Sequence, residues 1–241
     1  MSPLFIAFST LTVFPEIIGK WTTSQLKNSV IFYPVVGAFI GGCLALVWLT
    51  PLTNDIQALA AIILWVLLTM AFHLDGLGDC LDGWLGGQNP TERRKIMKDP
   101  ALGVYGVSGI VLVLLSKYVL LAHFFKQGGG WPWLIAIPAA ARYAVVISCF
   151  TSAPPPKDQG LGSKVLGLPL SSFLLSSLIT LSLGFLLRWE TLGVFFLCAL
   201  VSAGISALSK NLIGGLTGDG MGATIEVAEV VLLFLACLRF T

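Results

Sequence analysis

Three long stretches without a charged residue constrain this chain more than any other feature of its sequence. They cover residues 28–54, 165–187 and 192–209, and each is as long as the roughly 17–25 apolar residues that cross a bilayer as an α-helix. Charged residues make up 11% of the chain, against about 25% in a typical soluble domain. These features exclude a soluble enzyme and predict an all-α integral membrane protein.

Segment lengths and the positions of Gly, Pro and charged residues predict a polytopic bundle of about seven transmembrane helices. We expect the spans at 30–51, 57–74, 104–125, 132–150, 169–187, 192–208 and 223–240, with boundaries defined to within a few residues. The apolar segment 1–15 lacks the positive start and the cleavage site of a signal peptide. We predict a short interfacial or re-entrant N-terminal helix there, and a single transmembrane catalytic domain over residues 1–241.

The basic residues gather in the loops on one side of the predicted bundle. Nine of the 14 lysines and arginines fall on this side: Lys20, Lys27, Arg93, Arg94, Lys95, Lys98, Lys157, Lys164 and Lys210. Because cytoplasmic loops carry the excess of Lys and Arg, this side is predicted to face the cytoplasm. A net charge of +2, without a basic tract interleaved with aromatic residues, excludes nucleic acid as a partner.

An aspartate-rich segment follows the second predicted span on the cytoplasmic side: Phe72-His73-Leu74-Asp75-Gly76-Leu77-Gly78-Asp79-Cys80-Leu81-Asp82-Gly83. Asp75, Asp79 and Asp82 lie at i, i+4 and i+7, so a helix presents their carboxylates on one stripe. Like charges in a partly desolvated site need a cation, and oxygen ligands favour Mg²⁺, Mn²⁺ or Ca²⁺. We therefore predict a divalent metal, with phosphate groups of the substrate completing its shell. A solvated helix end is the alternative.

A second acidic helix is predicted at the start of the last span. Asp219 is followed by Glu226 and Glu229 at i+7 and i+10, so the three carboxylates can share one side of the helix. Two acidic helices that face each other can hold one or two metal ions around a diphosphate. We therefore expect Asp219, Glu226 and Glu229 to act as metal ligands together with the first aspartate stripe.

Glycine-rich segments on the same side are candidate seats for phosphate, because their backbone N–H groups and helix N-termini bind anions. The candidate residues are Asp99, Gly103, Gly106, Gly162, Gly215, Thr217 and Gly218. Residues 160–164 lack the full phosphate-loop pattern and are interpreted as a loop that can contact substrate. We interpret the basic run 93–98 mainly as a topology signal and a contact with lipid headgroups.

Three ionisable side chains within the predicted spans have more than one interpretation. Lys117 and Arg142 either pair with acidic residues or clamp the substrate phosphate, and the planar guanidinium of Arg142 suits a bidentate clamp. His73 can bind metal, act as an acid or base, or orient Asp75. A hydrogen-bonded structural histidine is an equal alternative.

These residues resemble the adenosylcobinamide-GDP ribazoletransferase (cobalamin synthase) family in three motifs. They are Phe72-His73-Leu74-Asp75-Gly76-Leu77-Gly78-Asp79-x-x-Asp82-Gly83, Asp99-x-x-x-Gly103-x-x-Gly106, and Gly214-Gly215-x-Thr217-Gly218-Asp219-x-x-Gly222-Ala223-x-x-Glu226-x-x-Glu229. Lys117 and Arg142 are also similar to the family pattern. The family more often has alanine at position 78, and region 154–164 matches mainly in Gly160-Leu161-Gly162.

The resemblance implies a Mg²⁺-dependent transferase in a bacterial or archaeal cell membrane, with its active site facing the cytoplasm. Adenosylcobinamide phosphate would pass from adenosylcobinamide-GDP to α-ribazole or its 5′-phosphate, with release of GMP and formation of adenosylcobalamin or its 5′-phosphate. The implied catalytic residues are Asp75, Asp79, Asp82, His73 and Arg142. A carboxylate or His73 would take the proton of the nucleophile. Membrane lipid is a further partner, and a homo-oligomer is compatible with the sequence.

Two other classes of membrane protein are distinguished from this family by features of the sequence. CDP-alcohol phosphatidyltransferases use the pattern D-x-x-D-G-x-x-A-R, which continues here from Asp79-x-x-Asp82-Gly83 to Gly86-Gly87 and so lacks the Ala-Arg pair. Cation transporters place ionisable residues near the midplane between repeated halves. In this chain most acidic residues lie at one interface and the halves do not repeat, so a transporter is the less favoured alternative.

Overall fold

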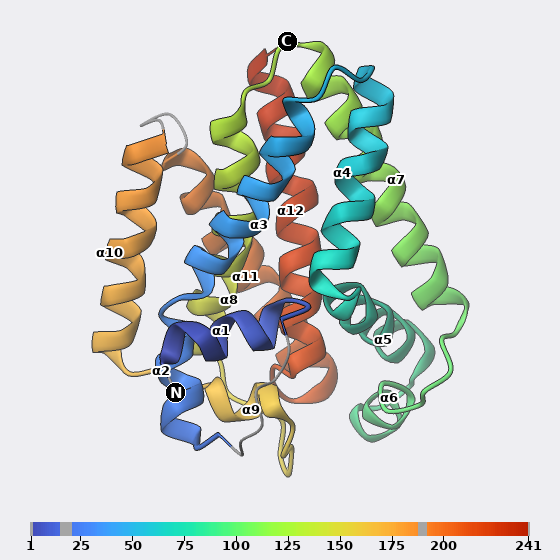
Figure 1. Ribbon diagram of the computed structural model, residues 1–241. Helices are drawn as coiled ribbons and strands as arrows, with labels where there is room; N and C mark the ends of the chain where they lie inside the picture. Colours follow the sequence, from blue (N-terminus) through green and yellow to red (C-terminus); the bar gives the residue numbers. More distant parts are fainter. Residues whose placement is uncertain (1, 15–20, 188–191, 241) are drawn as a thin grey trace.

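The chain folds into a bundle of helices, shown in Figure 1, with no strand in the described residues. The computed structural model describes residues 2–14, 21–187 and 192–240. Its helices are α1 Pro3–Leu11, α2 Thr23–Val30, α3 Tyr33–Trp48, α4 Asn54–Thr69, α5 Phe72–Gly86, α6 Pro90–Ile96, α7 Val104–Lys126, α8 Trp131–Thr151, α9 Leu161–Val165, α10 Leu170–Leu187, α11 Leu192–Ile213 and α12 Gly218–Phe240.

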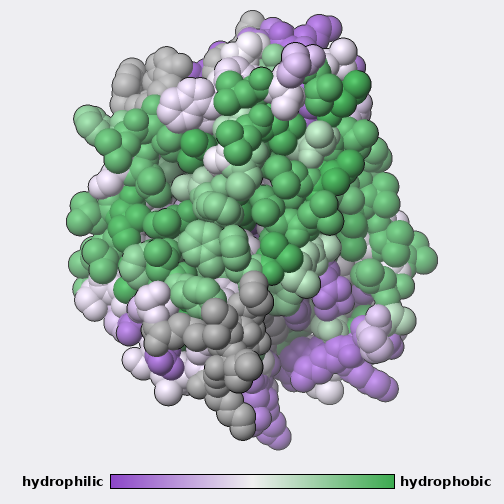
Figure 2. Space-filling model, viewed as in Figure 1, coloured by the Kyte–Doolittle hydropathy of each residue, from purple (hydrophilic) through white to green (hydrophobic). Residues whose placement is uncertain are grey.

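Among the described residues, five helices are long and apolar enough to cross a membrane by themselves, namely α7, α8, α10, α11 and α12. The pairs α2/α3 and α4/α5 also pass when taken together, although they are bent by 54° and 85°, which gives up to seven spans. On the face shown in Figure 2, a broad apolar band separates two more hydrophilic ends. The prediction of an all-helical membrane protein with about seven spans is confirmed.

The break between α4 and α5 is the main departure from the expected spans. The second span was expected to run through residue 74, but α4 ends at Thr69. Met70 and Ala71 have φ values of 52° and 55°, a left-handed conformation that no α-helix can continue through. The chain therefore turns by 85°, and α5 lies across the end of the bundle (Figure 1).

The bundle is built around α8 and α12, the two long helices whose side chains are mostly buried. Helix α8 packs against α3, α10, α11 and α12. Its contact with α3 is close because Gly37 and Gly41 of α3 lie directly against backbone carbonyls of α8. Helices α7, α10 and α11 expose most of their apolar side chains, as expected for helices that face lipid.

One end of the bundle carries the short helices and the polar loops. Figure 1 shows α1 lying across the bundle near this end, with α5, α6, α9 and the start of α12 gathered there. Of the basic residues that sequence places on the cytoplasmic side, six lie in α6, in α9 or in the loops beside them: Arg93, Arg94, Lys95, Lys98, Lys157 and Lys164. Lys27 lies in α2 and Lys210 near the end of α11, and Lys20 lies outside the described residues. This end therefore holds the candidate site.

Candidate active site

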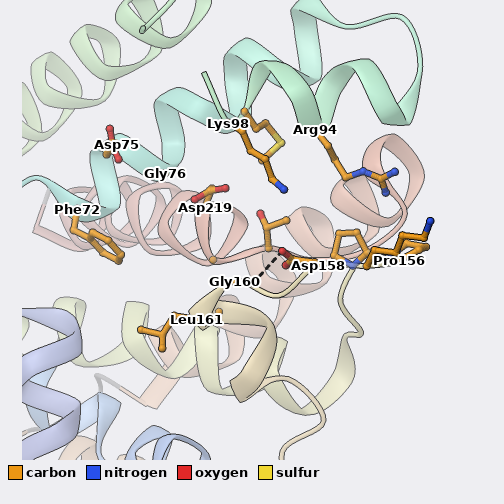
Figure 3. Close-up of a pocket in the computed structure, with 16 residues that line it drawn as sticks. Phe72, Asp75, Gly76, Arg94, Lys98, Pro156, Asp158, Gly160, Leu161 and Asp219 are labelled. Carbon is orange, nitrogen blue, oxygen red and sulfur yellow. Dashed lines mark hydrogen bonds between the residues drawn. The ribbon is translucent and has the colours of Figure 1, made fainter. Parts of the chain in front are cut away.

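A cavity of about 440 Å³ opens at the polar end, between α5, α6, α9 and the first turn of α12 (Figure 3). The charged residues on its wall are Asp75, Asp158, Asp219, Arg94, Lys98 and Lys157. In Figure 3 the side chains of Asp219 and Lys98 turn toward the same space, with Asp158 on its other side. A wall with both signs of charge can bind a cation and an anion next to each other.

The acidic side of the cavity depends on a close contact between α5 and α12. A Cβ atom on Gly76 would lie 2.9 Å from the Cα of Asp219, and one on Gly222 would lie 3.0 Å from the carbonyl oxygen of His73. Two glycines therefore let the helix backbones approach. This approach brings Asp219 next to the aspartate stripe of α5, as the sequence predicted for two facing acidic helices.

The carboxylates repel one another across this contact. Asp79 is half-buried, and its pKa is raised to about 7, first by desolvation and then by the charges of Asp219, Asp75 and Asp82. A carboxyl that holds its proton near neutral pH in such company is stabilised as an anion by a cation. The donor set fits Mg²⁺, which is usually held by one or two carboxylates, waters and substrate phosphates.

In the described residues there is no group of three or more His, Cys, Asp or Glu side chains arranged to hold a metal ion by themselves. The sequence expected up to six protein ligands: Asp75, Asp79, Asp82, Asp219, Glu226 and Glu229. The structure brings two of them, Asp75 and Asp219, to the cavity wall, and Asp79, which is not on that wall, is close enough to feel the charges of both.

Asp82 has a different environment from the other two aspartates of the stripe. It is buried, and its two carboxylate oxygens accept hydrogen bonds from the backbone N–H groups of Gly103, at 2.7 Å, and Gly106, at 2.9 Å. Gly103 precedes α7 and offers no side-chain cap, so Asp82 caps this helix from α5. The two glycines, expected to bind phosphate, bind Asp82 instead. Asp99 is exposed and bonds the N–H of Ala101.

Glu226 and Glu229 lie deeper in α12, in a buried ion-pair network. The ammonium group of Lys117 is 2.7 Å from Glu226 and also binds Glu229, and the guanidinium of Arg142 binds the other oxygen of Glu229. Nη2 of Arg142 lies 3.4 Å from Nδ1 of His73. Lys117 and Arg142 were expected either to pair with acidic residues or to clamp phosphate. In the structure both pair with acidic residues. Neither base lines the cavity.

The basic side of the cavity comes from the run that we interpreted as a topology signal. Arg94 donates to the carbonyl of Ile213 at 3.0 Å, and Arg93 donates to those of Gly87 and Leu212. The two arginines thereby cap the end of α11 and fix α6 at the cavity. Arg94 and Lys98 on its wall were missed as site residues. Their i, i+4 spacing, which would place both on one face of a helix, was the available signal, although Lys98 lies in the turn after α6.

The loop before α12 forms the floor of the cavity. Gly162, Thr217 and Gly218 line it as the sequence predicted, whereas Gly215 lines a separate cavity between α8 and α11. The hydroxyl of Thr217 accepts from the N–H of Gly220 at 3.2 Å and so caps α12. A Cβ on Gly162 would lie 2.5 Å from the Cα of Gly218, so this glycine is needed for close packing of α9 on α12.

The contact between α5 and α12 can be tested by Gly76→Ala. The added methyl group would meet the backbone of Asp219 at 2.9 Å, and a backbone atom cannot move aside as a side-chain end can. We expect the substitution to push the two acidic helices apart, with a loss of roughly 1–3 kcal/mol in stability and a marked fall in activity. The control is Gly42→Ala, because nothing lies within 4 Å of a Cβ there. Equal activity of the two variants would contradict the close contact.

Comparison with known proteins gives a full-length match. The family model described as cobalamin-5-phosphate synthase matches residues 3–237. A protein of Acinetobacter baumannii named adenosylcobinamide-GDP ribazoletransferase is 38% identical over 97% of this chain and 96% of its own length. One of the same name from Pseudomonas syringae pv. syringae is 36% identical over 99% of this chain and all of its own. No solved structure matches.

Proposed function

Because the chain belongs to the cobalamin-5-phosphate synthase family, we propose that the cavity at the polar end is where its transferase reaction takes place. The activity is that of an adenosylcobinamide-GDP ribazoletransferase, and adenosylcobinamide-GDP and ribazole are its substrates. The observation that carries the proposal is the cavity itself, whose wall combines acidic residues from α5 and α12 with Arg94 of α6 and Lys98 of the turn that follows it.

Asp75, Asp79 and Asp219 are the residues that would hold Mg²⁺. The metal would neutralise charge on the diphosphate of the donor, which is its usual contribution in phosphoryl transfer. Support comes from the crowding of the carboxylates and the raised pKa of Asp79. Asp82 would act mainly by holding the start of α7 in place, because each of its oxygens accepts a hydrogen bond from a backbone N–H group there.

Arg94, Lys98 and Lys157 are the residues that would bind the anionic substrate. They stand on the cavity wall, while Lys117 and Arg142 are engaged in ion pairs inside the bundle. Positioning and charge neutralisation supply most of the catalysis in such transfers. Basic side chains at the diphosphate would stabilise the charge that develops on the departing GMP.

Residues of the cavity would also act on the acceptor substrate. A ribose hydroxyl that is free in both α-ribazole and its 5′-phosphate attacks the phosphorus that carries the cobinamide arm, and the bond from that phosphorus to the GMP oxygen breaks. A carboxylate of the cavity, Asp75 or Asp219, would accept the proton of the hydroxyl. The cavity faces the side rich in Lys and Arg, so the proposed location of the reaction is the cytoplasmic face of the bacterial membrane.

The proposal is tested with purified protein in lipid nanodiscs. We expect GMP and the cobalamin product to appear together, by mass spectrometry, from adenosylcobinamide-GDP and α-ribazole or its 5′-phosphate. EDTA is expected to abolish both products and added Mg²⁺ to restore them. Product formation that is unaffected by EDTA would contradict the metal site, and the absence of product from folded protein would contradict the reaction at this cavity.

A further inference from the structure

A small chamber adjoins the main cavity behind Phe72. Its volume is about 90 Å³, and it shares four wall residues with the main cavity: Phe72, Leu161, Gly162 and Gly218. Most of its remaining wall is apolar and comes from several helices, with Val145 of α8 and Met221 and Ile225 of α12 among the contributors. Such a wall favours a flat apolar ring and disfavours a phosphate group.

Besides Tyr33, the ionisable residue of this wall is His73. Its Nδ1 lies 3.4 Å from Nη2 of Arg142, and a guanidinium can donate hydrogen bonds but cannot accept them. Nδ1 must therefore be the acceptor, which leaves the proton of the neutral ring on Nε2. That nitrogen is buried and has no hydrogen-bond partner among the described residues. It is a donor whose burial costs free energy until an acceptor meets it.

We propose that this chamber receives one edge of the heteroaromatic base of the acceptor nucleoside, and that Nε2–H of His73 donates a hydrogen bond to an unprotonated ring nitrogen of that base. The inference rests on the proposed function, because ribazole is a benzimidazole nucleoside and presents such a nitrogen. It assigns a specificity role to His73 that is separate from the metal and from proton transfer.

The sizes of the two cavities support this division of the acceptor. A chamber of 90 Å³ has room for about three waters of ~30 Å³ each, so it holds the edge of a base but not a nucleoside. The exposed ring of Phe72 borders both cavities and offers a surface on which the rest of the base can stack. The sugar and its attacking hydroxyl then lie in the main cavity, beside Asp75 and Asp219.

The hydrogen bond makes a prediction about selectivity. An indole isostere of ribazole has a C–H group in place of the ring nitrogen, so it would leave Nε2–H of His73 buried and unpaired. Sites that hydrogen-bond a substrate discriminate against analogues that lack the partner. We expect the full-length protein in nanodiscs to bind α-ribazole roughly 3- to 10-fold more tightly than the isostere.

Isothermal titration calorimetry with each nucleoside, in EDTA and without the donor substrate, separates this binding from catalysis. His73→Phe keeps a flat ring but removes the donor, and we expect it to bind the two nucleosides equally. His73→Gln retains an N–H donor and should keep part of the preference. The matched control is His123→Phe, because the other histidine lies in the last turn of α7, and it should behave as the wild type.

Each outcome decides a different claim. Equal binding of the two nucleosides by the wild type, or a preference that survives in His73→Phe, would overturn the assignment of His73 while the transferase reaction stands. If the wild type bound neither nucleoside, the assignment of this chamber would fall whether or not products form. If the wild type bound the two nucleosides with the expected preference but released little GMP in the transferase assay, only the proposed catalytic residues would be contradicted.

Discussion

Replacing Asp219 by asparagine is expected to lower turnover by roughly 10²- to 10³-fold, the cost of losing one charged group that acts in the transition state. Asp219 stands where α12 meets α5 and lines the cavity. The substitution removes one of several crowded carboxylates, so the metal-free protein should be as stable as the wild type or more stable. The rate of GMP release measures the first effect, and a thermal unfolding assay in EDTA measures the second.

The matched control for this variant is Asp55→Asn. Asp55 is exposed in the first turn of α4, at the opposite end of the bundle from the cavity, so its loss should change neither property. Turnover of Asp219→Asn at the level of Asp55→Asn would show that the α12 carboxylate does not act in the reaction. A large loss of stability would show instead that Asp219 is mainly structural.

Replacing Lys117 by methionine is expected to have the largest effect on folding. Lys117 is buried between Glu226 and Glu229, and the substitution leaves these two carboxylates close together with one positive partner, Arg142. Breaking a buried ion pair from one side costs about 3–5 kcal/mol. We expect a sharply lower unfolding temperature, measured by the reaction of a thiol dye with buried cysteines such as Cys149 and Cys198.

Two further variants keep this prediction specific. Lys126→Met removes an exposed lysine at the end of the same helix and should leave the unfolding temperature unchanged. The double variant Lys117→Met with Glu226→Gln removes a negative charge together with the positive one, so it should recover part of the lost stability. If Lys117→Met unfolded at the same temperature as Lys126→Met, the network would not stabilise the fold.

The helices were predictable where apolar residues run for the length of a membrane. The expected spans 104–125, 132–150 and 169–187 match α7, α8 and α10 to within one residue at each end. The break after Thr69 was not predictable, because Met70 and Ala71 are ordinary helix residues with no Gly or Pro beside them. Their left-handed conformation accompanies the 85° turn from α4 into α5.

The site was predictable in its residue types and only partly in its partners. Spacing placed Asp75 and Asp79 on one face of a helix and indicated a second acidic helix at Asp219, and packing through Gly76 unites them. Spacing also placed Glu226 and Glu229 on that second helix, but it could not show that Lys117 and Arg142 face them. Which neighbour meets a helix face is decided by the tertiary fold.

The central claim is that carboxylates of α5 and α12 together bind a divalent cation, and equilibrium binding of Mn²⁺ tests it most directly. Electron paramagnetic resonance reports the free ion in the presence of the full-length protein in nanodiscs. We predict binding that Mg²⁺ displaces, that persists in Asp55→Asn, and that is lost in both Asp79→Asn and Asp219→Asn. Equal binding by all of these proteins, or no displacement by Mg²⁺, would contradict the site.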